Sequence, residues 1–146
     1  IGIPEELLDK TTGWGRKDAE LMKKHVEFGC FLLLGLANFS ALTTFYSHYF
    51  KKEDGYPSDQ DFTRIFGKAY DSWSEASRTK AKYLGRLVAL ADTYDAITTR
   101  KNDKFSPGKA RLLSPSEAEA VFLACNPDQE FLIRQLYSAR ILGGKV

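Results

Sequence analysis

The sequence is short of the residues that mark secreted, membrane-spanning and nucleic-acid-binding chains. It has only two cysteines in 146 residues, Cys30 and Cys125, so no disulfide framework is expected and we predict a cytoplasmic protein. No uncharged apolar run approaches the roughly 18 residues that a membrane-spanning helix needs. The net charge of +2 gives little electrostatic attraction to nucleic acid polymers or anionic membranes. The 43% hydrophobic content is enough for the core of a single domain over residues 1–146.

Strand-like alternation and internal repeats are also missing, and apolar residues recur at helical spacing instead. Ser114 and Glu117 form an N-terminal capping pattern, and Gly143 and Gly144 follow the last periodic segment. The sequence therefore predicts an all-α protein. The expected helices are a short turn at 4–10, a long helix at 17–36, a second from 38 or 40 to 50, one or two surface helices within 59–82, a central helix at 83–99, and two more at 115–124 and 129–142.

The predicted central helix contains a carboxylate that would need a cation, and the sequence has only two histidines that could help to bind one. Residues 86–98 are apolar nearly all round, with Asp92 in the middle, which is typical of a core helix. An ionised carboxylate in a core needs a cation, either a metal ion or an Arg or Lys partner. The only two histidines, His25 and His48, lie in other predicted helices. We predict that His25, His48 and Asp92 converge on a metal ion.

Several segments of the sequence resemble the HD-GYP branch of the HD phosphohydrolase superfamily, and they occur in the order in which that family has them. The opening residues 1–10 are similar to the segment that follows the family's His-Asp doublet. The resemblance covers roughly residues 1–124. The other matching pieces are His25 with Gly29, Ser47 with His48, the triplet Gly55, Tyr56 and Pro57, and the segment 86–98 with Asp92 and Asp95.

The resemblance implies an HD-domain-like helical bundle that binds divalent metal, iron or manganese, and hydrolyses cyclic di-GMP or a related cyclic dinucleotide or phosphoester. In such a site the metals activate a bridging water and hold phosphate oxygens. His25, His48 and Asp92 match three metal-ligand positions of the family. Asp95 shares a helix face with Asp92, and we expect it to accept a hydrogen bond behind the ligands.

Two further segments are candidates for contacts with substrate or partner. Arg100 falls near a family position that touches substrate phosphate, and Lys104 lies in the same basic stretch, which alternatively is an ordinary solvated loop. The triplet Gly55, Tyr56 and Pro57 matches the loop that names the family. Because it follows His48 closely, we expect this loop next to the metal pocket, where it would also contact a signalling protein.

Two departures from the family pattern leave the function open. Tyr49 stands where the family has a second consecutive histidine, and no His-Asp doublet is present. By the resemblance, the doublet would lie just before Ile1. Either this chain is a fragment of a longer protein that contains it, or the protein never had a full site. We expect a fragment, and we expect the chain alone to be weak or inactive. One interpretation is a metal-dependent phosphodiesterase. The alternatives are a degenerate, inactive domain that signals through protein contacts, and a helical regulatory bundle whose motifs arise by chance.

Overall fold

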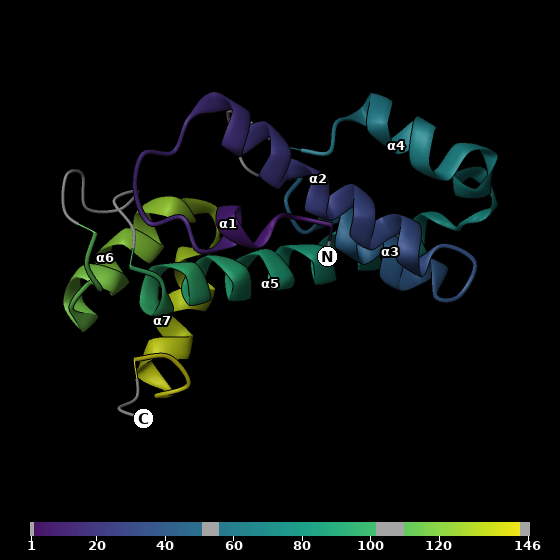
Figure 1. Cartoon of the computed structure of the whole chain (residues 1–146). Coiled ribbons are helices and arrows are strands. Elements are labelled where there is room, and N and C mark those ends of the chain that lie inside the picture. Colours follow the sequence, from purple (N-terminus) through teal and green to yellow (C-terminus); the bar gives the residue numbers. More distant parts are fainter. Residues whose placement is uncertain (1, 51–55, 102–109, 144–146) are drawn as a thin grey trace. The chain divides into compact units, whose positions relative to one another are not determined.

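The computed structural model describes residues 2–50, 56–101 and 110–143, and within these ranges it contains helices and no strand (Figure 1). The all-α prediction is confirmed. No helix among the described residues combines the length and apolar character that crossing a membrane requires. The helices are α1 (Glu5–Leu8), α2 (Arg16–Leu33), α3 (Asn38–Tyr46), α4 (Asp59–Phe66), the 3-10 helix η1 (Gly67–Ser72), α5 (Glu75–Thr99), α6 (Pro115–Cys125), the 3-10 helix η2 (Pro127–Gln129) and α7 (Glu130–Ser138).

The contacts within the chain define two compact units, Ile1–Ala89 and Leu90–Val146. The division falls inside α5, so this helix contributes to both units. Of the predicted metal ligands, His25 and His48 belong to the first unit and Asp92 to the second.

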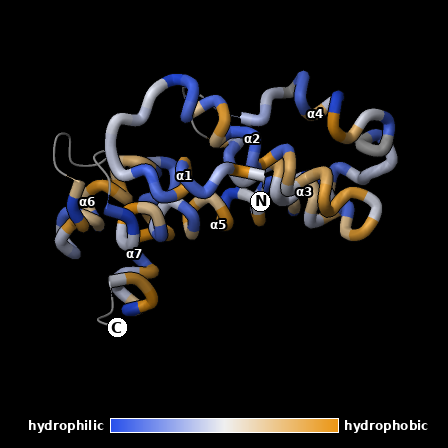
Figure 2. The backbone as a smooth tube through the Cα atoms, in the orientation of Figure 1, coloured by the Kyte–Doolittle hydropathy of each residue, from blue (hydrophilic) through white to orange (hydrophobic). Residues whose placement is uncertain are grey.

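The core of the first unit is built around α3. Helix α3 lies within residues 28–50, where only the titratable His48 can carry a formal charge, and Figure 2 shows hydrophobic colouring at the end of α2, just before α3 in the chain. Such a helix is buried on several sides. Phe45 is fully buried, and its ring meets Tyr46, Phe62 and Phe66 at centroid distances of 5.5, 4.9 and 5.6 Å. The buried cluster comprises Val26, Cys30, Ala41, Leu42, Phe45, Tyr46, Ile65, Phe66 and Ala81.

Two helices begin with reciprocal hydrogen bonds between a serine and an acidic residue three positions later. At α6, the Glu117 backbone N–H donates to Ser114 Oγ (3.4 Å), and Glu117 Oε2 accepts from the Ser114 backbone N–H (2.8 Å). The predicted capping pattern is therefore present. Ser58 and Asp61 form the same arrangement at α4. Hydrogen bonding from Arg111, followed by bonds from Ser114, holds the pKa of Glu117 well below its usual range.

Several helix ends differ from the predicted ones. Helix α2 stops at Leu33 because Gly35 adopts a left-handed conformation (φ 83°) that turns the chain. Helix α3 stops at Tyr46, where the Ser47 hydroxyl donates to the Thr44 carbonyl (2.7 Å) and competes with a further helical turn. Helix α5 begins at Glu75, well before residue 83, because residues 75–82 are mostly good helix formers.

The second unit packs α6 and α7 with the C-terminal part of α5. The Tyr94 ring meets Phe122 and Tyr137 at 5.5 and 6.4 Å between centroids. Its hydroxyl accepts a hydrogen bond from the Gly143 backbone N–H (2.9 Å), which ties down the end of the described chain. Phe122 and Ile133 are fully buried and form the apolar centre of this unit.

We expect the two cysteines to differ sharply in reactivity. Cys30 is fully buried, and burial, with a smaller contribution from Glu27, raises the pKa of its thiol to about 12. Because the thiolate is the nucleophile, a thiol reagent at pH 8 should modify only the exposed Cys125 in the native protein. Both thiols should react in denaturant. Rapid labelling of the native Cys125→Ser variant would contradict this expectation.

Candidate metal-binding histidine pair

The structure places His25 and His48 in direct contact. His25 lies in α2, and His48 lies in the turn that follows α3. Their ring centroids are 4.8 Å apart with an interplanar angle of 79°. His48 is buried and His25 is half-buried. The packing of α2 against α3 therefore brings together two of the three predicted metal ligands.

The hydrogen bond made by His25 determines which ring nitrogen can bind a cation. His25 Nδ1 is bonded to the backbone carbonyl of Met22, one turn earlier in α2. A carbonyl oxygen can only accept, so Nδ1 must carry the proton. In the neutral imidazole the lone pair then lies on Nε2.

The same conclusion follows for His48 by one further step. The Ser47 hydroxyl has a single proton, which it donates to the Thr44 carbonyl (2.7 Å). The contact between Ser47 Oγ and His48 Nδ1 (3.0 Å) therefore has Nδ1 as the donor. In the neutral form of either ring, the lone pair therefore lies on Nε2, which is the nitrogen able to coordinate a cation. A metal-bound histidine characteristically has its other nitrogen held by such a hydrogen bond.

The spacing of the two rings fits a shared ion. Two imidazole nitrogens bound to one metal at about 2.1 Å, with an angle of roughly 90–110° at the metal, place the ring centroids about 4.6–5.3 Å apart. The observed 4.8 Å lies in this range. Ordinary edge-to-face packing gives similar separations, so the protonation pattern supports a metal site more strongly than the distance does.

Tyr56, from the predicted Gly55, Tyr56 and Pro57 loop, lies beside the histidine pair. Its ring centroid is 5.0 Å from that of His48 and 6.3 Å from that of His25. Pro57 is buried, and Gly55 lies outside the described residues. The described part of the loop therefore lies beside the histidine pair, and its place next to a metal pocket stays a prediction.

The second unit holds the remaining acidic candidates. Asp92 is half-buried rather than enclosed in a core, because α5 exposes Val88 and Ala91 near it. Asp95 is exposed. Its backbone carbonyl accepts a hydrogen bond from Thr99 Oγ1 (2.7 Å), and its carboxylate is 3.5 Å from Arg100. Within the described ranges, no group of three or more His, Cys, Asp or Glu side chains forms a metal site. The approach of Asp92 to the histidine pair stays a prediction, and Lys104 lies outside the described residues.

Tyr49, which stands at the family's second histidine position, packs with other aromatic rings. Its ring meets those of Tyr46 and Phe50 at 5.5 and 5.8 Å between centroids, in edge-to-face geometry. The side chain is half-buried and packs against the core cluster of the first unit. This position therefore contributes aromatic packing in this chain.

Two residues near the histidines were not assigned a role from the sequence. Ser47 fixes the tautomer of His48, and the only sequence signal for this was its position directly before the histidine. Lys23 places its ammonium 5.6 Å from the centroid of the Tyr56 ring. No sequence pattern distinguished Lys23 from Lys24, because the distinction depends on which side of α2 faces Tyr56.

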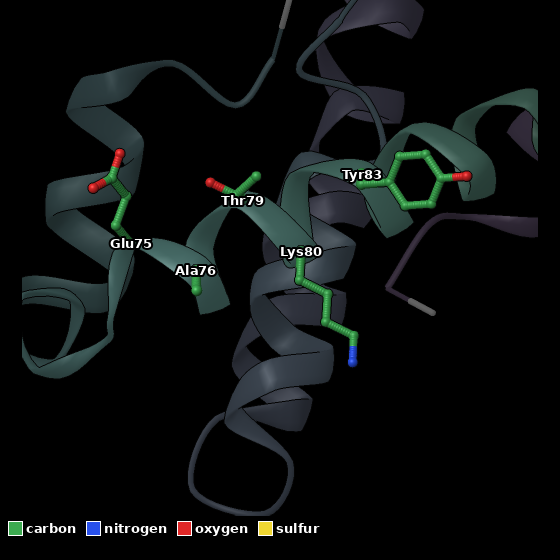
Figure 3. A pocket seen from close by; sticks show the side chains of 5 residues that line it. All are labelled: Glu75, Ala76, Thr79, Lys80 and Tyr83. Carbon is green, nitrogen blue, oxygen red and sulfur yellow. The ribbon is translucent and has the colours of Figure 1, made fainter.

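A surface depression lies on α5, lined by Glu75, Ala76, Thr79, Lys80 and Tyr83 (Figure 3). All five residues come from this one helix, and all are exposed. It is a shallow helix face without converging polar groups, so the histidine pair is the stronger candidate site.

This chain was compared with protein-family models, with curated proteins and with solved structures. None of the three comparisons finds a match.

Replacing Ser47 by alanine tests the proton arrangement. Without the Ser47 oxygen, the Nδ1–H of His48 loses its acceptor, and we expect a larger population of the tautomer protonated on Nε2. Any affinity for divalent metal should fall by about 10- to 100-fold, as is typical when a partner behind a ligand is lost. Two-dimensional ¹H–¹⁵N spectra of the imidazole rings report the tautomer directly. Ser40→Ala, at an exposed position of α3, is the matched control, and equal effects in both variants would contradict the assignment.

Proposed function

We propose that this chain is a metal-dependent phosphohydrolase-like domain of HD-GYP type, acting on cyclic di-GMP or a related cyclic dinucleotide or phosphoester. The observation that carries the proposal is the contact between His25 and His48, whose Nδ1 atoms both make hydrogen bonds, which leaves Nε2 as the nitrogen that would coordinate an ion. Imidazole nitrogen together with a carboxylate suits iron or manganese.

Each residue has a defined part in this proposal. His25 and His48 would hold the ion through Nε2, while the Met22 carbonyl and the Ser47 hydroxyl keep the rings in the coordinating tautomer. Asp92 would supply the carboxylate that offsets the metal charge. A bound ion would provide Lewis acidity and an activated water.

Substrate contacts are proposed for the basic stretch that follows α5. The ion pair between Arg100 and Asp95 is 3.5 Å long, and both side chains are more than half exposed. Such a pair is weak, so Arg100 can exchange its carboxylate for a phosphate oxygen. Lys104 is a second cation of the same stretch.

A degenerate signalling domain is the second candidate, and Tyr49 favours it. An aromatic side chain packed among Tyr46 and Phe50 replaces a ligand that would help to hold a second metal. A bridging water requires two ions held close together. In this alternative, the loop of Gly55, Tyr56 and Pro57 contacts a protein partner without turnover.

Metal titration decides whether the histidine pair binds an ion. We expect calorimetry with Mn²⁺ to show binding to the wild-type chain, and His25→Ala or His48→Ala to weaken it by more than about 100-fold. Asp92→Ala should also weaken it, whereas Asp95→Ala, at an exposed position of the same helix, should change it little. Circular dichroism would establish that each variant is folded. Affinity unchanged by removal of either histidine would refute the site.

A hydrolysis assay with cyclic di-GMP separates the two candidates. With Mn²⁺ or Fe²⁺ supplied, we expect slow turnover by the wild-type chain and none by His48→Ala. Metal binding with no turnover of any cyclic dinucleotide would favour the signalling domain.

A further inference from the structure

Lys23 and the histidine pair both contact the ring of Tyr56. Its Nζ is 5.6 Å from the centroid of the Tyr56 ring. That ring is the one that contacts both His48 and His25, at 5.0 and 6.3 Å. A cation held over an aromatic face is attracted by the ring quadrupole. The contact with Tyr56 thus keeps a positive charge at the margin of the candidate site.

The ammonium of Lys23 has capacity for another acceptor. The Glu20 carboxylate is 3.5 Å from Lys23 Nζ, and the Glu20 side chain is 62% exposed. The Lys23 side chain is 30% exposed, so it is partly open to solvent. An ammonium has three donors and no acceptor. A long, exposed ion pair with Glu20 satisfies this group only weakly.

The neighbouring lysine provides a direct comparison. Lys24 follows Lys23 in α2, carries the same charge, and is exposed. Successive residues on a helix point in directions about 100° apart, so the Tyr56 contact belongs to Lys23. If positive charge in general favours ligand binding, removing either lysine should weaken binding. If the position of the ammonium matters, only removal of Lys23 should weaken it.

We infer that Lys23 binds a phosphate oxygen of an anionic ligand held at the His25 and His48 pair. This inference rests on the proposed function, because it assigns a role in recognising the phosphate of that ligand. Lysine binds phosphate as a compact point charge. Lys23 therefore acts as a specificity-determining residue for phosphoesters, and Tyr56 sets the position of its ammonium.

The test is a calorimetric titration of inorganic phosphate into the full chain, both metal-free and saturated with Mn²⁺. Lys23→Gln should raise the dissociation constant for phosphate about tenfold, the size expected for a charge-assisted hydrogen bond. Lys24→Gln should change it less than about twofold, since an exposed charge away from the site is screened. Lys23→Arg, which keeps the charge, should restore most of the affinity. Melting temperatures would show that the variants are folded.

The outcomes for Lys23 and for the proposed function are separable. Mn²⁺ titration without phosphate tests the metal site, and Lys23→Gln should leave that affinity unchanged. Equal phosphate affinities for wild type and Lys23→Gln, or equal losses for Lys23→Gln and Lys24→Gln, would overturn the role of Lys23. Absence of phosphate binding by the wild-type chain would overturn it too. If Mn²⁺ does not bind, the metal-free phosphate titration still decides the matter for Lys23.

Discussion

Replacing Phe45 by alanine should lower the free energy of unfolding by about 4 kcal/mol, within the range for a fully buried phenylalanine. Phe45 has no exposed surface, and its ring contacts three others, those of Tyr46, Phe62 and Phe66. The substitution removes this apolar contact and leaves a cavity that the surrounding rings can fill only in part. Urea denaturation followed by circular dichroism measures the loss.

Phe131 is the matched control for this substitution. Its side chain is 79% exposed in α7, so Phe131→Ala should change stability by less than about 0.5 kcal/mol. Phe45→Ala should also weaken metal binding, because His48 follows Phe45 by three positions and its turn rests on α3. A loss in Phe45→Ala no greater than in Phe131→Ala would show that the aromatic cluster does not stabilise the first unit.

Replacing Gly85 by alanine should be destabilising by about 3 kcal/mol, although alanine is the better helix former. A Cβ at position 85 would lie 2.6 Å from Tyr46 Cβ, 2.9 Å from the Thr43 carbonyl oxygen, and 2.9 Å from the Tyr46 carbonyl carbon. Two of these three atoms belong to the backbone, so no side-chain rotation relieves the clash. Helix α5 must instead move away from α3. Thermal and urea unfolding measure the effect.

Gly29 provides a graded comparison within α2. A Cβ there would meet only the Thr44 Cγ2 methyl, at 3.1 Å. A small shift of that methyl relieves the contact. The higher helix propensity of alanine contributes up to about 1 kcal/mol, which offsets the remaining cost. We therefore expect Gly29→Ala to be nearly neutral. Equal destabilisation by Gly29→Ala and Gly85→Ala would show that α3 and α5 leave room for a Cβ at position 85.

The helices were predictable because helix formation depends mainly on nearby residues. Apolar spacing indicated the long helix that carries His25, and the pattern of Ser114 and Glu117 located the start of α6. The helix ends were less predictable. The end of α3 depends on the Ser47 hydroxyl, and residues 75–82, which the sequence placed in a separate surface helix, are the first turns of α5.

The candidate site was predictable only in part. The scarcity of histidine pointed to His25 and His48, and the structure places these two rings 4.8 Å apart. The expected environment of Asp92 was wrong in one respect, since this residue is half-buried. A run of apolar residues predicts burial on average, but the exposure of each helix face depends on which partners cover it.

The sequence by itself determined that this protein is helical and that histidine and cysteine are scarce, because composition and periodicity are local properties of the chain. The tertiary structure decided which residues meet. The contact of the two histidines, the tautomer fixed by Ser47, the choice of Lys23 over Lys24 and the close approach at Gly85 all depend on how α2, α3 and α5 pack in the first unit. Rotating a helix by one residue moves each side chain by about 100°, and only the packed core determines that rotation.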